Sequence, residues 1–423
     1  MVQMANRIRT GSATAESIML ACLSRIDQRE REVGAFTCYD ADAALAAAKK
    51  KDQSAPKGPL HGVPFGIKDI IDTKQFPTGW GSKCYEGFRS MRNASCVEWF
   101  LRAGAIPVGK TVTTEFAYFK PGKTANPSHP GHTPGGSSSG SAAAVADNML
   151  PFAFGSQTAA SLIRPASYCG IPGYKASHGS FDLDGIMSLS PSLDTLGFLA
   201  RRIEDFELGR TVLCGSVPAP DIDLSNSTLR ISLFRGPHWH DGSVEMRDVC
   251  QSAIKCLQSA GVEVGEQSCP EIFHELTEAQ KTVMAYEVAR SRIYEYSHYS
   301  EQISDQFLEL LEQGLSVPRN EFETSCAIRD RASRILESMF IDCDFLLAPA
   351  APGEAPRGLE ATGDPLFSRA WNLLKVPSVS IPFGKGPGGL PLSVQLIGRY
   401  GDDDALLSAV KWVYGCLQNK PDL

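Results

Sequence analysis

The sequence lacks the features that would tie the protein to a membrane, to nucleic acid or to a secretory route. No apolar run approaches the roughly 20 residues that span a bilayer. The longest basic run is the three lysines at 49–51 and the formal net charge is −7, so no cationic face is available to neutralise phosphates. The first ten residues have no apolar core of a signal peptide. We therefore expect a cytoplasmic protein that binds neither nucleic acid nor membranes.

Paired cysteines and clustered metal ligands are also missing. The twelve cysteines have no C-x-x-C spacing, which in a chain of 423 residues predicts reduced core residues rather than a disulfide framework. His238 and His240 lie beside Asp241, but two histidines in a loop without further ligands are usually surface residues. We expect no metal and no other cofactor.

The sequence does contain an alternation of helical and buried strand patterns. Thr14 can cap a first helix, and residues 40–51 and 243–260 also have helical patterns. Residues 149–154 resemble a buried strand and residues 182–197 a loop, and further strand-like runs occupy residues 106–110, 229–234, 262–264, 344–349, 377–382 and 391–397. This alternation predicts an α/β layer structure with a mostly parallel or mixed sheet.

The clearest change in composition is the segment 216–226, which is rich in proline, serine and aspartate. We nevertheless expect a single domain over residues 1–423, since large α/β enzymes often form one continuous unit. Its core would comprise residues 61–214, followed by a more variable helical lobe at about 215–345 and by C-terminal core strands at 346–423.

Three short segments carry residues suited to acyl transfer without histidine. Gly135 to Ser141 reads GGSSSGS, Gly155 to Pro165 reads GSQTAASLIRP, and Lys68 lies between apolar neighbours in GIKD. A serine hydroxyl needs a base to take its proton, and a lysine whose charge is disfavoured by burial can be that base. Glycine- and serine-rich loops are more often connectors, and Lys68 could simply pair with Asp69 at a surface turn. By residue type alone, Ser138 suits the role as well as Ser137.

Residues 61–175 resemble the amidase signature family, and the resemblance continues at 367–382 and 389–398, so it spans nearly the whole chain. It implies a single large mixed β-sheet surrounded by helices. It also implies a catalytic triad: Ser161 as nucleophile, Ser137 as a bridging serine after a cis peptide bond, and Lys68 as base. The family's interval of 24 residues favours Ser137 over its neighbours.

The same resemblance assigns an oxyanion hole to the backbone N–H groups of Thr158, Ala159, Ala160 and Ser161. This chain reads T-A-A-S where the family usually reads T-G-G-S. If these positions required φ > 0, each alanine would cost about 1–2 kcal/mol. A catalytically impaired, amidase-like binding protein is therefore one alternative.

Arg164 lies three residues after Ser161, where malonamidase-like members of the family carry an arginine for a substrate carboxylate. Gln157 and Thr158 could add donors near the same carboxylate. The resemblance thus implies an amidohydrolase that cleaves a small linear amide, such as a dicarboxylic acid monoamide, through a serine acyl-enzyme. A small-molecule amide is its expected partner, with a homodimer as the expected assembly. The alternative for Arg164 is a structural arginine before Pro165, since buried arginines often serve internal ion pairs. The alternative for the function is an amidotransferase A-type subunit that needs partner chains.

Overall fold

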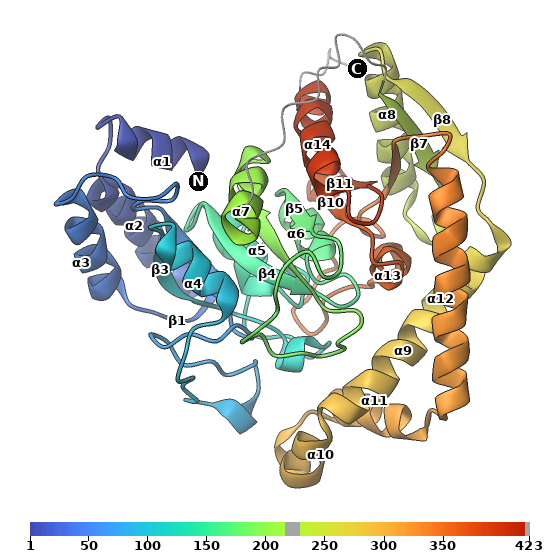
Figure 1. Ribbon diagram of the computed structural model, residues 1–423, viewed down its shortest axis with the longest axis horizontal. Coiled ribbons are helices and arrows are strands. Elements are labelled where there is room, and N and C mark those ends of the chain that lie inside the picture. Colours follow the sequence, from blue (N-terminus) through green and yellow to red (C-terminus); the bar gives the residue numbers. More distant parts are fainter. Residues whose placement is uncertain (216–228, 419–423) are drawn as a thin grey trace.

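The computed structural model describes residues 1–215 and 229–418 and has a single mixed sheet at its centre (Figure 1). Its eleven strands follow the order β1-β3-β2-β4-β6-β5-β10-β11-β9-β7-β8. The α/β sheet expected from the sequence is confirmed. The strands are β1 (Phe36–Tyr39), β2 (Pro64–Lys68), β3 (Ile106–Thr111), β4 (Phe152–Gln157), β5 (Gly173–Lys175), β6 (Thr195–Ala200), β7 (Arg230–Phe234), β8 (Glu263–Gln267), β9 (Phe345–Pro349), β10 (Ser378–Lys385) and β11 (Pro391–Ile397).

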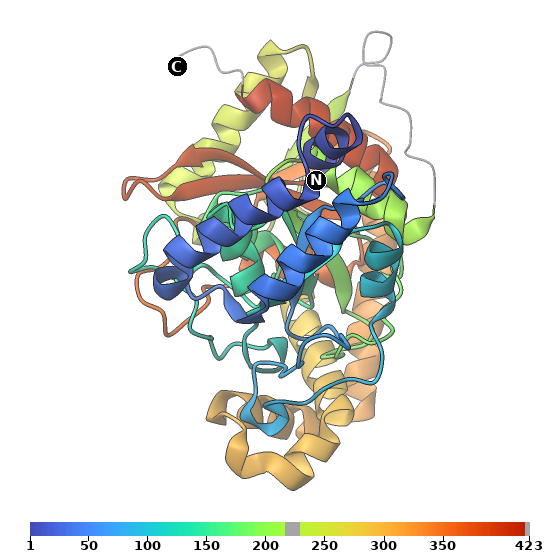
Figure 2. The ribbon, with the colours of Figure 1, turned by 90° about the vertical axis from the view of Figure 1, so that its left-hand side faces the viewer.

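Helices surround this sheet, and α9 to α11 project away from it in both ribbon views (Figures 1 and 2). No helix in the two described ranges is long and apolar enough to cross a membrane. The helices are α1 (Val2–Arg9), α2 (Ala15–Val33), α3 (Ala41–Asp52), α4 (Ser95–Arg102), α5 (Ser139–Ala146), α6 (Ile163–Cys169), α7 (Glu204–Cys214), α8 (Val244–Ser259), α9 (Leu276–Ser291), α10 (Ile293–Tyr299), α11 (Asp305–Ser316), α12 (Arg319–Met339), α13 (Leu366–Leu373) and α14 (Asp403–Gln418).

Local signals located the helices better than the strands. The Thr14 hydroxyl accepts a hydrogen bond from the Ser17 N–H at 3.0 Å, so α2 begins where the sequence predicted. The expectation of a loop over 182–197 was wrong at its end, because β6 begins at Thr195. The expected strand at 149–154 instead lies at 152–157 as β4. These two strands pair antiparallel over six residues, and this pairing, rather than local propensity, fixes their limits.

The segment 216–226, which the sequence marks as a change in composition, lies outside the described residues. After it, β7 pairs in parallel with both β8 and β9. The two strands that follow the segment therefore extend the main sheet. The helices α9 to α12 follow them and pack mainly on one another, with α13 also against α9.

Aromatic side chains fill the space behind β2 and β4. The Phe65 ring lies 5.2 Å from that of Phe100 and 5.8 Å from that of Phe154, and the Phe100 ring lies 4.5 Å from that of Phe154. All three residues are fully buried. Tilted and edge-to-face aromatic pairs of this kind hold their backbones in a fixed relation. The packed aromatic side chains therefore support the ends of β2 and β4, at Lys68 and Gln157, rigidly.

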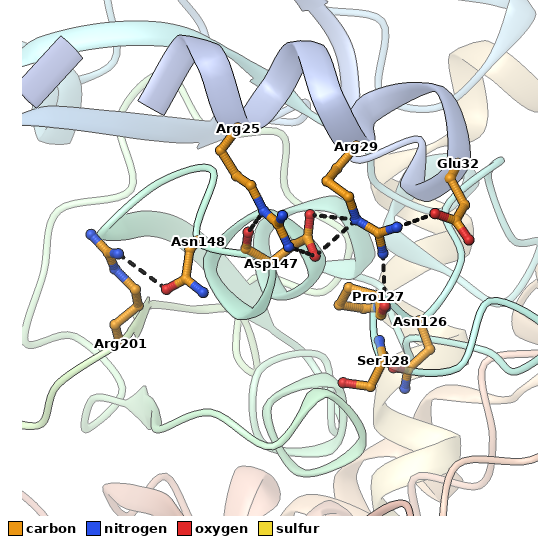
Figure 3. Close-up of polar contacts among 9 residues, drawn as sticks. All are labelled: Arg25, Arg29, Glu32, Asn126, Pro127, Ser128, Asp147, Asn148 and Arg201. Atoms are coloured by element: carbon orange, nitrogen blue, oxygen red, sulfur yellow. Dashed lines mark hydrogen bonds and ion pairs between the residues drawn. The ribbon is translucent and has the colours of Figure 1, made fainter. Parts of the chain in front are cut away.

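An ion cluster joins α2 to the end of α5 (Figure 3). Arg25 donates to the Asp147 carboxylate at 2.9 Å and to its backbone carbonyl at 2.8 Å, and Arg29 donates to the same carboxylate at 3.2 Å. Arg29 also donates to the carbonyl of Pro127 at 3.0 Å. Because Asp147 is buried and serves two arginines, this cluster fastens the helix that begins within the GGSSSGS segment.

Replacing Asp147 by alanine should leave both arginines without their shared carboxylate and lower the free energy of unfolding by about 1–3 kcal/mol. Thermal and urea denaturation measure the loss. The matched control is Asp184→Ala, which removes an exposed pair with Arg92 and should cost about 1 kcal/mol or less. Equal stability of the two variants would contradict a structural role for the cluster.

Candidate active site

Lys68 ends β2 in a fully buried position. Its Nζ donates to Ser137 Oγ at 2.7 Å and to Ser156 Oγ at 2.8 Å. No carboxylate of the described residues lies within ion-pair distance of it. Burial lowers the pKa of the Lys68 amine to about 7, and the negative charge of Asp194 opposes this only in part. A large fraction of Lys68 is therefore neutral near pH 7 and able to accept a proton.

The alternative that Lys68 pairs with Asp69 is wrong. Lys110 on β3 is the partner of Asp69, with its Nζ 3.2 Å from Asp69 Oδ1. Lys110 also donates to Thr78 Oγ1 at 2.7 Å and to the carbonyl of Ile71 at 2.8 Å. Its amine is thus hydrogen-bonded beside a carboxylate, whereas that of Lys68 meets only hydroxyl groups.

The structure separates Ser137 from Ser138. The Gly136–Ser137 peptide bond is cis, as the resemblance implies, and Ser137 Oγ faces the Lys68 amine. Ser138 Oγ instead exchanges hydrogen bonds of 3.3 Å with the backbone N–H and carbonyl of Ser156. Its own N–H donates to the Ser161 carbonyl at 3.3 Å, which brings the two serine segments together. Among these hydroxyls, only that of Ser137 and that of Ser156 contact the amine.

Ser161 lies between the end of β4 and the start of α6 and lines a narrow pocket. Its Oγ has no hydrogen bond to any described residue, so the contact from Ser137 to Ser161 is not closed in this structure. The close approach of the two serine segments, 135–141 and 155–165, depends on Gly155. A Cβ there would lie 2.5 Å from Leu162 Cδ2 and 2.9 Å from Ser138 Oγ. Glycine is therefore required here for close packing.

Gln157 does not face this pocket, although we expected it to bind substrate. It is fully buried, and its Oε1 accepts hydrogen bonds from the N–H groups of Leu162 at 2.9 Å and Ile163 at 3.1 Å. The side chain therefore fixes the turn that carries Ser161. It thereby supplies an acceptor for N–H groups at the start of α6, which have no partner within the helix.

Four consecutive backbone N–H groups stand open beside Ser161. Within the described ranges, those of Thr158, Ala159, Ala160 and Ser161 have no acceptor. The Thr158 carbonyl is held from the other side by Gln280 Nε2 at 3.1 Å and Asn372 Nδ2 at 2.7 Å. With the Thr158 carbonyl held in place, the four N–H groups are oriented to stabilise a developing oxyanion.

The two alanines of this loop cause no backbone strain. Neither Ala159 nor Ala160 is among the non-glycine residues with positive φ. The cost that alanine would have at φ > 0 therefore does not arise, and backbone strain gives no reason to suspect an impaired site.

Sequence reasoning missed Ser156 and Asp194. Ser156 supplies the second hydroxyl on Lys68. Asp194 accepts from Thr158 Oγ1 at 2.6 Å, and it also accepts from the Ser188 hydroxyl and from the N–H groups of Leu189 and Ser190. Burial raises the pKa of Asp194 to about 6. Asp194, a lone aspartate in a serine-rich loop, gave no signal in the sequence. Ser156 could have been considered as a site residue, since it adjoins Gln157. The Thr158 hydroxyl is bonded to this aspartate and is not free for substrate.

Arg164 is held by neutral groups of the protein. Its Nη2 donates to the Gly136 carbonyl at 2.7 Å and to Thr362 Oγ1 at 3.1 Å, and its Nη1 donates to the Gly363 carbonyl. No described carboxylate pairs with it, but its contacts with Gly136, Thr362 and Gly363 agree with the alternative of a structural arginine. Burial lowers its pKa to about 10, which leaves it charged at neutral pH. Arg164 thus fastens the carbonyl directly before Ser137 while also lining the pocket.

The pocket at Ser161 has a volume of about 20 Å³ and adjoins a cavity of about 560 Å³. The two share four lining residues, Tyr118, Phe119, Pro365 and Arg369. In the described residues there is no group of three or more His, Cys, Asp or Glu side chains that could hold a metal ion. The arrangement therefore places the Ser161 hydroxyl and four backbone donors beside a small pocket that opens into a wider cavity, with a lysine amine of lowered pKa next to Ser137.

Solved structures of similar shape belong to amidases. A crystal structure described as an amidase has a TM-score of 0.88 and 27% sequence identity over 98% of this chain and 99% of that one. The peptide amidase of Stenotrophomonas maltophilia has a TM-score of 0.83 and 24% identity over 99% of this chain and 97% of that one, a likeness that shows the fold alone.

The sequence is also similar to amidotransferase subunits. The A-type subunit of the glutamyl-tRNA(Gln) amidotransferase from Lachnospira eligens is 31% identical over 96% of this chain and 96% of the relative. Its counterpart from Desulforapulum autotrophicum is 30% identical over 98% of this chain and 96% of the relative. The amidase family model matches residues 17–407. The chain therefore belongs to the amidase family, as its resemblance to the amidase signature enzymes predicts.

Proposed function

We propose that this protein hydrolyses the C–N bond of a small amide through an acyl-enzyme on Ser161, with Ser137 and Lys68 as the proton relay. The observation that carries the proposal is the buried contact of 2.7 Å between Lys68 Nζ and Ser137 Oγ, made by an amine with a pKa of about 7. A buried base of this pKa is matched to proton transfer near neutral pH.

In the first step, neutral Lys68 accepts the Ser137 hydroxyl proton while Ser137 accepts that of Ser161. Ser161 Oγ then forms a bond to the amide carbon, and the carbonyl oxygen becomes an oxyanion. The open N–H groups of residues 158–161 would stabilise that charge. The relay returns a proton to the leaving nitrogen as the C–N bond breaks, and water then hydrolyses the ester.

The substrate that we propose is a small linear amide bearing a carboxylate. The acyl site beside Ser161 is narrow, and two guanidinium groups, those of Arg164 and Arg369, line it without carboxylate partners among the described residues. Buried cations without counter-charges favour an anionic ligand. None of the similar proteins named above is described as acting on a malonamate-like substrate.

A second candidate function is that of an A-type amidotransferase subunit. The relatives that carry this name match over 96% to 98% of this chain, and they favour this candidate more directly than the carboxylate-bearing monoamide. Amide cleavage at Ser161 would be shared by both candidates, but the released ammonia would then pass to a partner chain. An impaired binding protein has no support from the backbone geometry of the alanines.

Ammonia release by the purified chain tests the proposal. The assay takes a panel of neutral amides, dicarboxylic acid monoamides and glutamine, with no partner added. Turnover of one of these by the chain alone supports the hydrolase. Turnover that appears only with amidotransferase partner chains and charged tRNA supports the second candidate, and turnover in neither setting contradicts both.

Ser161→Ala should abolish both hydrolysis and covalent labelling by a fluorophosphonate, because it removes the oxygen that bonds to the acyl carbon. The matched control is Ser138→Ala, because the Ser138 hydroxyl bonds only to the backbone of Ser156. This variant should keep most of the hydrolysis and most of the labelling. Mass spectrometry of the labelled peptide locates the adduct. Labelling that persists in Ser161→Ala would refute the assignment.

The rate should rise with pH through an apparent pKa of about 7, since the depressed pKa of Lys68 makes the neutral amine available above that value. Lys68→Ala should lower kcat by at least about a hundredfold and abolish this rise in rate with pH, the ascending limb of the pH–rate profile. Lys175→Ala is the control, because Lys175 is an equally buried lysine with a pKa of about 7 that bonds to the Ala176 carbonyl. The assignment fails if Lys175→Ala removes the limb and Lys68→Ala keeps it.

A further inference from the structure

Arg369 lies where the narrow pocket of Ser161 meets the wide cavity. It belongs to α13 and lines both spaces, and only 6% of the residue is exposed. A ligand that reaches Ser161 from the cavity must therefore pass its guanidinium.

The guanidinium of Arg369 has an open edge. Its one hydrogen bond within the described chain runs from Nη1 to Gln280 Oε1, a neutral acceptor. Its Nε and Nη2 have no acceptor among the described residues. Because Arg369 lines both the pocket and the cavity, these two donors are available to a ligand there. They form the side of a guanidinium that binds a carboxylate through two parallel hydrogen bonds.

The same edge of Arg164 is blocked. Its Nη2 is taken by the carbonyl of Gly136 and the hydroxyl of Thr362, and its Nε is buried without a partner. A bidentate carboxylate on Arg164 would have to displace the contact that fastens the residue before Ser137. Of the two arginines that line the pocket, only Arg369 can take a carboxylate without such a rearrangement.

Acidic groups near Arg369 do not neutralise it at contact range. Burial lowers the pKa of Arg369, and Tyr118, Asp364 and Glu278 oppose this only in part. No carboxylate of residues 1–215 or 229–418 comes within ion-pair distance of it, and Glu278 pairs with Lys281. The charge of Arg369 is therefore available to a ligand.

We propose that the Nε–Nη2 edge of Arg369 binds the carboxylate of the substrate, and that Arg164 is a positioning residue for the Gly136–Ser137 segment. The proposal rests on the hydrolase function above and specifies its substrate class. Because Ser161 and Arg369 line one narrow pocket, the carboxylate and the amide belong to the two ends of a short molecule.

The kinetic test compares a short dicarboxylic acid monoamide with a neutral amide of equal length. Arg369→Ala should lower kcat/KM for the charged amide about thirtyfold or more relative to the neutral one, mainly by raising KM. Gln280→Ala is the matched control, because it breaks the link from Arg369 to the Thr158 carbonyl without touching the open edge. It should slow both substrates equally. Equal losses on both substrates in Arg369→Ala would overturn the proposal.

A binding test does not depend on turnover. Malonate is titrated calorimetrically into the Ser161→Ala protein, with and without Arg369→Ala or Arg164→Ala. We expect Arg369→Ala to weaken binding at least tenfold, and Arg164→Ala to weaken it less. Binding that is lost only in Arg164→Ala, or that is absent from the parent protein, overturns the proposal. Malonate binding through Arg369 in a protein that hydrolyses no amide would instead refute the proposed function alone.

Discussion

The removal of the Lys68 amine from water is the constraint on which the rest of the site depends. A lysine in solution is almost fully protonated at neutral pH, so it can serve as a base only where burial penalises its charge. Here the amine sits at the end of β2 with two serine hydroxyls as its only hydrogen-bond partners in the described chain. The packed aromatic side chains behind β2 and β4, and the ion cluster at the end of α5, keep the surroundings of this amine rigid.

The surrounding polar groups are divided between holding the site and leaving donors free. Gln157 fastens the turn after Ser161, and Asn372 and Gln280 fasten the Thr158 carbonyl. Asp194 takes the Thr158 hydroxyl. The N–H groups of residues 158–161 remain without acceptors in the described residues. Such preorganised donors stabilise charge without first having to reorient.

Much of this arrangement could be predicted from the sequence, because its signals are local or belong to a family pattern. The α2 cap, the α/β alternation, and the segments of Lys68, Ser137 and Ser161 were all located in this way. The strand β6 and the residues Ser156 and Asp194 were not, since each owes its role to a neighbour far away in the chain. Arg164 suits a carboxylate by residue type and position, but the sequence does not show that its two Nη atoms are bonded to Gly136, Thr362 and Gly363. Only three-dimensional contacts could direct attention to Arg369.

Whether Lys68 is a neutral amine in the folded protein near pH 7 can be measured by NMR titration of lysine side chains labelled with ¹³C at Cε. The signal that disappears in Lys68→Ala belongs to this residue, and it should titrate with a pKa of about 7, while exposed lysines titrate near their usual value of about 10.4. A Lys68 signal that titrates with the exposed lysines would contradict the proposed relay, because the amine would then be protonated and unable to accept the serine proton.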